Sequence, residues 1–302
     1  MKKVTLSLLL LATLSTASEI EYGKGTFKLT GGFLGLSQSI NEDVTTYSLV
    51  ERHANIPASN ISYGYDFSWY DSKTLKQAES ILNLGISPLN NPLIPANNNL
   101  QVPAMDYRVK GLDANIQLGY DVIHQDADNF LSIGTLVGVS IPWIDALMSD
   151  SNNNNSNNNN TQTNTFPDTK TSFMTYKVGP AINFKKSLVS NKISLYGSAT
   201  YAYQTGNIKN DYADTEYSVD GSYQEYNMGL YFTPFTETFK WGWLSLSPRI
   251  YATLGYKYSK WDVGDMTIDT SGTQLSSTVL DPFNSKFKME SSTTYAGIGY
   301  KF

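Results

Sequence analysis

The chain has 302 residues and a formal net charge of −5, and charged residues make up only 16% of it. It contains 21 Tyr, 13 Phe and 5 Trp but no Cys. This composition excludes a disulfide-stabilised fold, a Cys-based metal site and a basic surface for nucleic acid. No cofactor is expected either.

The N-terminal residues have the pattern of a secretory signal peptide. Two Lys residues precede an apolar run from Val4 to Leu14, and small residues follow it. The run is too short to cross a bilayer as a helix, and its flanks suit cleavage. We therefore expect residues 1–17 to be a signal peptide and residues 18–302 to form a single domain.

Most of the remaining sequence alternates apolar with small or polar residues, which is the period of a β-strand. The expected strands lie at residues 26–40, 60–70, 112–122, 131–141, 174–184, 193–204, 226–233, 244–258 and 293–302. No ionisable side chain falls on the apolar parity of these strands. A Lys or Arg in the middle of a bilayer costs about 2–4 kcal/mol, so the apolar parity is expected to face lipid.

The last of these strands has the most specific pattern. Ile298, Tyr300 and Phe302 share one parity, and the sequence ends on the aromatic ring. This ending resembles the C-terminal strand signature of bacterial outer-membrane β-barrels, the porin-like superfamily, although no motif points to a narrower family. The resemblance implies an all-β, transmembrane antiparallel barrel in the bacterial outer membrane. It also implies contact with membrane lipid and lipopolysaccharide, and recognition of the last strand by the barrel assembly machinery. The oligomeric state stays open.

The strand number needs one more element, because nine strands are recognised and bacterial barrels have even counts. Residues Thr74 to Ser87 could supply a tenth strand. Their spacing also suits a helix that folds over an eight-stranded barrel. We expect about ten strands, with eight or twelve as the alternatives.

Connection lengths orient the expected barrel, since short turns face the periplasm and long loops the exterior. The connections His124 to Asn129 and Ser187 to Asn191 are short. The long connections are Trp143 to Thr171, Asn207 to Gly221, and Asp262 to Lys286.

All five Trp residues lie at the ends of expected strands, where an amphipathic ring suits the membrane interface. They are Trp69, Trp143, Trp241, Trp243 and Trp261.

Several charged residues fall on the polar parity and are expected to face the lumen. They are Asp66, Asp113, Asp121, Lys177, Lys185, Arg249 and Lys257. Such charges either line a water-filled path or pair across a filled interior.

Catalytic signals are weak, because the chain has only two His residues. His124 is expected at a periplasmic turn. His53 is expected in the first external loop, near Ser48, Glu51 and Ser59, where a Ser-His-acid site is conceivable. No spacing singles out such a site, so we expect neither an enzyme nor a metal centre.

The leading functional hypothesis is a small porin-like channel for passive diffusion of ions or small solutes, centred on Lys177 and Arg249. One alternative is a closed barrel with structural or adhesive surface loops. The other is a barrel enzyme that uses His53.

Overall fold

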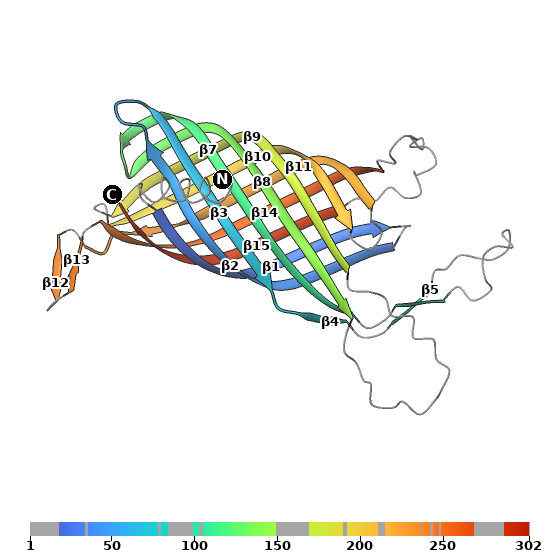
Figure 1. The fold of residues 1–302 in the computed structure, drawn as a ribbon. Coiled ribbons are helices and arrows are strands. Elements are labelled where there is room, and N and C mark those ends of the chain that lie inside the picture. Colours follow the sequence, from blue (N-terminus) through green and yellow to red (C-terminus); the bar gives the residue numbers. More distant parts are fainter. Residues whose placement is uncertain are drawn as a thin grey trace, which may run out of the picture.

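The computed structural model describes residues 18–33, 36–77, 80–83, 99–102, 105–148, 169–189, 192–210, 215–235, 237–241, 244–247, 249–268 and 287–301. The regular structure of these residues is entirely β (Figure 1). The signal peptide expected at residues 1–17 and the terminal Phe302 lie outside them. No helix among the described residues is long and apolar enough to cross a membrane.

Ten long strands of the described chain form one closed antiparallel barrel. They are β1 (Ser18–Phe33), β2 (Leu36–Asn55), β3 (Ile61–Ser72), β7 (Met105–Asp126), β8 (Asn129–Met148), β9 (Thr169–Val189), β10 (Ile193–Asn210), β11 (Thr215–Phe232), β14 (Ile250–Ile268) and β15 (Phe287–Tyr300). Five short strands accompany them: β4 (Leu75–Gln77), β5 (Ser80–Asn83), β6 (Asn99–Val102), β12 (Phe239–Trp241) and β13 (Leu244–Leu246).

The barrel closes because its first strand pairs with its last, and because β3 pairs with β7 across the intervening short strands β4 to β6. β1 pairs with β15 from Ser18 opposite Tyr300 onward. β3 pairs with β7, with Ile61 opposite Tyr120. The remaining neighbours follow the order β3-β2-β1-β15-β14-β11-β10-β9-β8-β7. Each of these ten strands therefore has a pairing neighbour on both sides over part of its length, so the ring has no edge strand of the kind that promotes edge-to-edge aggregation.

The two ends of the barrel differ in their connections. At the end that we call the turn end, β1 begins and β15 finishes, and residues 56–60, 127–128 and 190–192 connect strands. The β12–β13 hairpin also projects from this end (Figure 1). At the opposite end, the loop end, residues 73–104, 149–168 and 269–286 connect strands.

An apolar band surrounds the outer surface over the turn-end part of the barrel. On β7 it runs from Leu112 to Val122, eleven residues, which is about the length of a tilted membrane-spanning strand. Its large exposed side chains include Ile20, Tyr22, Tyr47, Ile61, Ile116, Leu118, Tyr120, Ile133, Val137, Tyr176, Val178, Ile182, Tyr201, Tyr226, Met228, Leu254, Tyr256 and Ile298.

The distribution of apolar residues outside and polar residues inside reverses where the strands leave this band toward the loop end. In β1, Ile20 and Tyr22 point outward while Glu19 and Glu21 are buried. Further along the same strand, Lys24 and Lys28 are exposed, while Phe27 and Leu29 are buried inside the barrel. The barrel is therefore apolar outside and polar inside at one end, and polar outside and apolar inside at the other.

This reversal corrects the expected lipid-facing parity of the first strand. The parity that includes Phe27 and Leu29 faces the lumen, and the outward parity carries Lys24 and Lys28. The assumption that no ionisable residue shares the outward parity was therefore wrong here. Alternation alone identifies two faces but does not say which of them meets lipid.

The number of ten strands is confirmed, but the tenth strand comes from a different place. The expected strand 26–40 is part of a hairpin of two long strands, β1 and β2, which share a ladder from Glu19–Val50 to Phe33–Leu36. Within Thr74 to Ser87 the described residues form only the short β4 and β5, outside the ten-stranded ring.

Other boundaries also shift. β10 and β11 stay paired as far as Asn210 and Thr215, so the expected long connection from Asn207 to Gly221 is mostly strand. The expected strand 244–258 is divided, because β13 ends at Leu246 and β14 begins at Ile250. The sequence has a Pro at position 248, which lacks the N–H that a central ladder requires.

Candidate functional site: the barrel lumen

The loop-end half of the lumen is filled by apolar side chains that we call the plug. Its buried members form one cluster: Phe27, Leu29, Val44, Tyr70, Val109, Phe173, Ala202, Ile208, Val219, Tyr223, Trp261, Val263 and Met289, with Ile144 packed against them. Each of the ten barrel strands contributes at least one of these side chains. The plug therefore extends across the whole barrel.

Aromatic rings occupy the middle of the plug. Phe27 stacks on Tyr70 with ring centroids 5.6 Å apart, and the ring of Trp261 lies 6.2 Å from Phe27. Trp261 also contacts Tyr223 at 5.4 Å, and its Nε1 donates to Ser140 Oγ at 2.9 Å. Burial of the indole is therefore combined with a partner for its polar atom.

The expected interfacial belt of Trp residues needs a correction. Trp261 is 3% exposed and lies inside the barrel, because it belongs to the inverted loop-end pattern. Trp69 of β3 and Trp143 of β8 are less buried, occupy outward positions, and pack edge to face at 5.2 Å across the intervening strand β7. The side chain of Trp241 and all of Trp243 lie outside the described part.

Below the plug, on its turn-end side, buried ion pairs cross the lumen. Lys177 Nζ donates to Asp113 Oδ1 at 2.5 Å and lies 3.9 Å from the centre of the Tyr223 ring. Lys257 forms ion pairs with Asp66 and with Glu225. We call these groups the ionic layer. Pairing and hydrogen bonding are what make buried charges tolerable.

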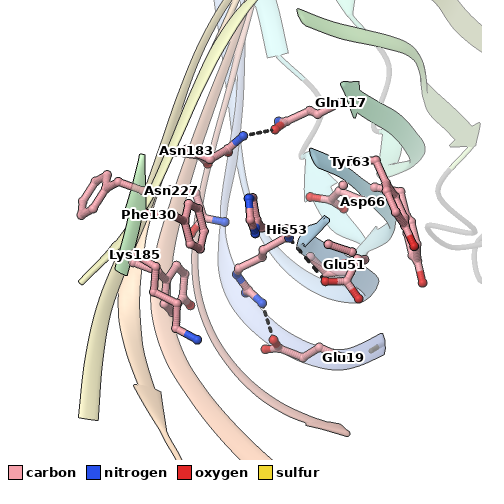
Figure 2. Close-up of a pocket in the computed structure, with 18 of the residues that line it drawn as sticks. Glu19, Glu51, His53, Tyr63, Asp66, Gln117, Phe130, Asn183, Lys185 and Asn227 are labelled. Atoms are coloured by element: carbon pink, nitrogen blue, oxygen red, sulfur yellow. Dashed lines mark hydrogen bonds and ion pairs between the residues drawn. The ribbon is translucent and has the colours of Figure 1, made fainter. Parts of the chain in front are cut away.

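Between the ionic layer and the turn end, the lumen contains a cavity of about 570 Å³. It extends to Pro57 and Ala127 in the turns and to Lys301 beyond β15. This volume lies within the range of small-molecule sites, about 300–1,000 Å³. Figure 2 shows Gln117 and Asn183 at one side of the cavity and Glu19 and Lys185 at the opposite side.

Arg52 is the central cation of the cavity wall. Its guanidinium donates to the carboxylates of both Glu19 and Glu21 and lies 4.5 Å from the centre of the Tyr196 ring. It also donates to Tyr295 Oη at 3.2 Å. This fork of donors holds β1, β2 and β15 together across the barrel seam.

A second group of charges lies at the turn-end mouth. Lys185 Nζ is 2.5 Å from Asp128 Oδ1 and 3.5 Å from the centre of the Tyr231 ring. Lys301 lies 3.5 Å from the same Asp128 oxygen. Tyr231 in turn stacks on Tyr251 at 4.3 Å. Lys301 Nζ also lies 5.0 Å from the centre of the Tyr231 ring, so two cations share one carboxylate and one aromatic ring.

The two His residues meet at a third group. His53 Nε2 hydrogen-bonds Asp121 Oδ1 at 2.9 Å, and His124 Nδ1 hydrogen-bonds Asp121 Oδ2 at 3.0 Å. The His53 ring also stacks on Phe130 at 3.6 Å. His53 belongs to β2 near the turn end, so its expected position in an external loop was wrong. In the part of the chain that the structure describes, no cluster of three or more His, Cys, Asp or Glu suits a metal ion.

The expected lumen charges therefore divide into two sets. The structure brings six of them to the lumen as paired groups: Asp66, Asp113, Asp121, Lys177, Lys185 and Lys257. Arg249 instead is exposed in a turn before β14, outside the lumen, which corrects the expectation for that residue.

Sequence reasoning missed the acids and the arginine that dominate the cavity. Glu19, Glu21, Glu51 and Arg52 lie in parts of β1 and β2 that the expected strands left out. A usable signal was present, because Glu19 and Glu21 alternate with the apolar Ile20 and Tyr22. Extending the strand search to residue 18 reveals this parity.

No protein-family model and no curated protein matches the chain. Among solved structures, it is similar to the outer membrane protease OmpT from Escherichia coli, with 10% identity over 95% of this chain and 97% of that chain, at a TM-score of 0.43. It is also similar to the translocator domain of the autotransporter NalP from Neisseria meningitidis, with 8% identity, coverage of 100% and 96%, and a TM-score of 0.35. A third similarity is to Ail, the attachment invasion locus protein of Yersinia pestis, with 10% identity, coverage of 95% and 99%, and a TM-score of 0.27.

At TM-scores this low, these similarities carry no argument about activity. The fold class follows from the chain's own closed sheet, with its apolar band on the outside. The protein has the fold of an outer-membrane β-barrel, and no narrower family is assigned.

Proposed function

We propose that this protein is an integral outer-membrane barrel that conducts no ions. Its function is then carried by its two ends, the loop end and the turn end. The observation that carries the proposal is the plug, to which every strand of the barrel contributes. A ten-stranded barrel is only slightly wider than the eight-stranded size whose interior side chains fill. Complete packing of one half of its lumen is therefore physically reasonable.

The chemistry of the lumen supports a closed state. The ionic layer pairs Asp113 with Lys177, and Asp66 and Glu225 with Lys257. A conducting filter needs charges that bind an ion weakly enough to release it. Charges that are already paired and buried serve the stability of the barrel instead.

Both ends of such a barrel remain available for function. The loop end carries the long connections 73–104, 149–168 and 269–286, which suits display of structural or adhesive loops outside the cell. The turn end carries the cavity and faces the periplasm if the usual orientation holds.

Electrical recording tests the proposal. Purified protein incorporated into planar bilayers is expected to give no conductance steps. A triple variant, Phe27→Ser with Tyr223→Ser and Trp261→Ser, removes the central rings of the plug and is expected to conduct. That variant serves as the positive control for insertion, and flotation with liposomes checks both proteins. Conductance steps from the unaltered protein would contradict the proposal.

A porin-like channel is the second candidate. It is favoured by the size of the cavity and by the charged lining between the ionic layer and the turn end. It requires the plug to move aside, and the recording above decides between the two candidates.

An enzyme is the third candidate, supported only by the contact of His53 with the acid Asp121. A His53→Ala variant that turns over lipid or peptide as the unaltered protein does would remove it.

A further inference from the structure

The cavity has more acid than base around it. Seven described acids line it or pair with residues that do: Glu19, Glu21, Glu51, Asp66, Asp121, Asp128 and Glu225. Four Lys or Arg side chains balance them: Arg52, Lys185, Lys257 and Lys301. These described groups leave an excess of three acidic side chains, which favours cations over anions.

Glu51 is the acid that lacks an ion-pair partner. Its side chain is buried, with the residue 6% exposed. Oε1 accepts only a long hydrogen bond of 3.4 Å from the backbone N–H of His53, and Oε2 has no partner among the described residues. Every other acid that lines the cavity is ion-paired with Arg52 or Lys257. Because an unpaired buried carboxylate is costly, Glu51 is neutralised either by a proton or by an incoming cation that pairs with it.

Two basic side chains in the wall of the cavity, Arg52 and Lys185, are bound in the same way. Arg52 lies over the ring of Tyr196, and Lys185 lies 3.5 Å from the centre of the Tyr231 ring. Both cations combine an aromatic face with a carboxylate. Aromatic rings attract cations through the negative charge on their faces, most strongly where water is excluded. The cavity lining near Glu51 contains further aromatic rings, among them Tyr65 and Tyr251.

We propose that the cavity binds a small organic cation that carries amino groups, with Glu51 as its charge partner. The excess of three acidic side chains fits a diamine better than a monoamine. The volume of about 570 Å³ accepts a short aliphatic chain. The access route is the turn end, through Pro57, Ala127 and Lys301, since the plug seals the other side. This inference goes beyond the proposed function. It requires only that a ligand can enter the cavity, whether or not the barrel conducts ions.

Calorimetry on the full chain, folded in detergent micelles, tests the proposal with a matched pair of ligands. 1,4-Diaminobutane is expected to bind saturably at low salt. 1,4-Butanediol has the same length but no charge, and it is expected to give no saturable binding. This comparison uses the unaltered protein and does not depend on the folding of any variant.

Two matched variants assign the binding to Glu51. Glu51→Gln is expected to weaken 1,4-diaminobutane about tenfold or more, because it removes one charge partner at constant shape. Glu42→Gln is the control, since Glu42 is also in β2, is also 6% exposed and also has one carboxylate oxygen without a partner. Glu42 pairs with Phe27 in the ladder and so lies at the level of the plug. Its variant is expected to bind like the unaltered protein.

Three outcomes would overturn the proposal. One is the absence of saturable binding by the diamine. Another is equal binding of the diol, which would mean that charge is not recognised. The last is a Glu51→Gln variant that binds as tightly as the unaltered protein or the Glu42→Gln control.

Discussion

The two halves of the lumen follow the same strands but opposite rules. Toward the loop end, Phe27, Trp261 and their neighbours form a dry core, while the outward positions carry Lys24 and Lys28. Toward the turn end, the interior is charged and hollow, and the outer surface is apolar. One half resembles a water-soluble barrel and the other a membrane barrel. The surrounding solvent decides which face of an alternating strand must be apolar.

The largest expected effect is at the boundary between the two halves. Lys177→Ala leaves Asp113 buried without its cation and is expected to lower the free energy of unfolding by about 4 kcal/mol. Urea titration of Trp fluorescence in lipid vesicles measures the loss. The double variant with Asp113→Ala is expected to recover part of it, because no charge is then left unpaired. An unchanged midpoint for the single variant would mean that the pair contributes nothing.

The next effect contrasts the plug with the outer surface through one residue type. Trp261→Ala opens a void among Phe27 and Tyr223 and is expected to cost about 3 kcal/mol. Trp143→Ala, at an outward position of β8, serves as the control and is expected to cost less than half as much. The same titration measures both variants. Equal losses would show that the plug is not packed like a protein core.

A smaller effect is expected where the turn-end half does pack closely. A side chain at Gly255 would collide with the ring and hydroxyl of Tyr295 and approach Tyr196. Gly255→Val is therefore expected to cost about 2 kcal/mol through displacement of these rings. Ala252→Val, three residues earlier on the same strand and facing outward, is the control and is expected to change little. Near-identical stabilities of the two variants would exclude a role for the ring contacts.

The smallest effect concerns a charge outside both halves. Arg249 is exposed in the turn before β14, so Arg249→Ala is expected to shift the free energy of unfolding by no more than about 0.5 kcal/mol. Lys257→Ala, in the ionic layer, provides the contrast on the following strand. A large loss of unfolding free energy from Arg249→Ala would indicate that this side chain lies in the lumen.

The sequence was sufficient for the class of fold, because long alternating segments and the Phe-ended final strand leave few other architectures. It was also sufficient for most of the lumen charges, since residues such as Asp113 and Lys177 lie on strands with a clean membrane pattern. It was not sufficient where the outer surroundings change along one strand. Trp261 and Phe27 alternate as well as any lipid-facing residue, and only the assembled barrel shows that they point inward.

Sequence patterns predicted only some of the residues of the site. Pairings across the barrel, such as Arg52 with Glu19 or Lys257 with Asp66, join residues that are distant in sequence. They depend on strand register and on how the sheet curls, which local patterns do not determine. The cavity follows from the same geometry, because small residues, amides and paired charges leave space that the aromatic plug does not.

The pairing of β1 with β15 has a consequence for how the barrel folds. Thr26 and Ser292 share a hydrogen bond across 266 positions of sequence, so the ring cannot shut until the final strand has been synthesised. Until then the sheet has two unpaired edge strands, and its apolar side chains have no closed barrel to cover. Before β1 and β15 pair, the chain is therefore prone to associate with other copies through these edges.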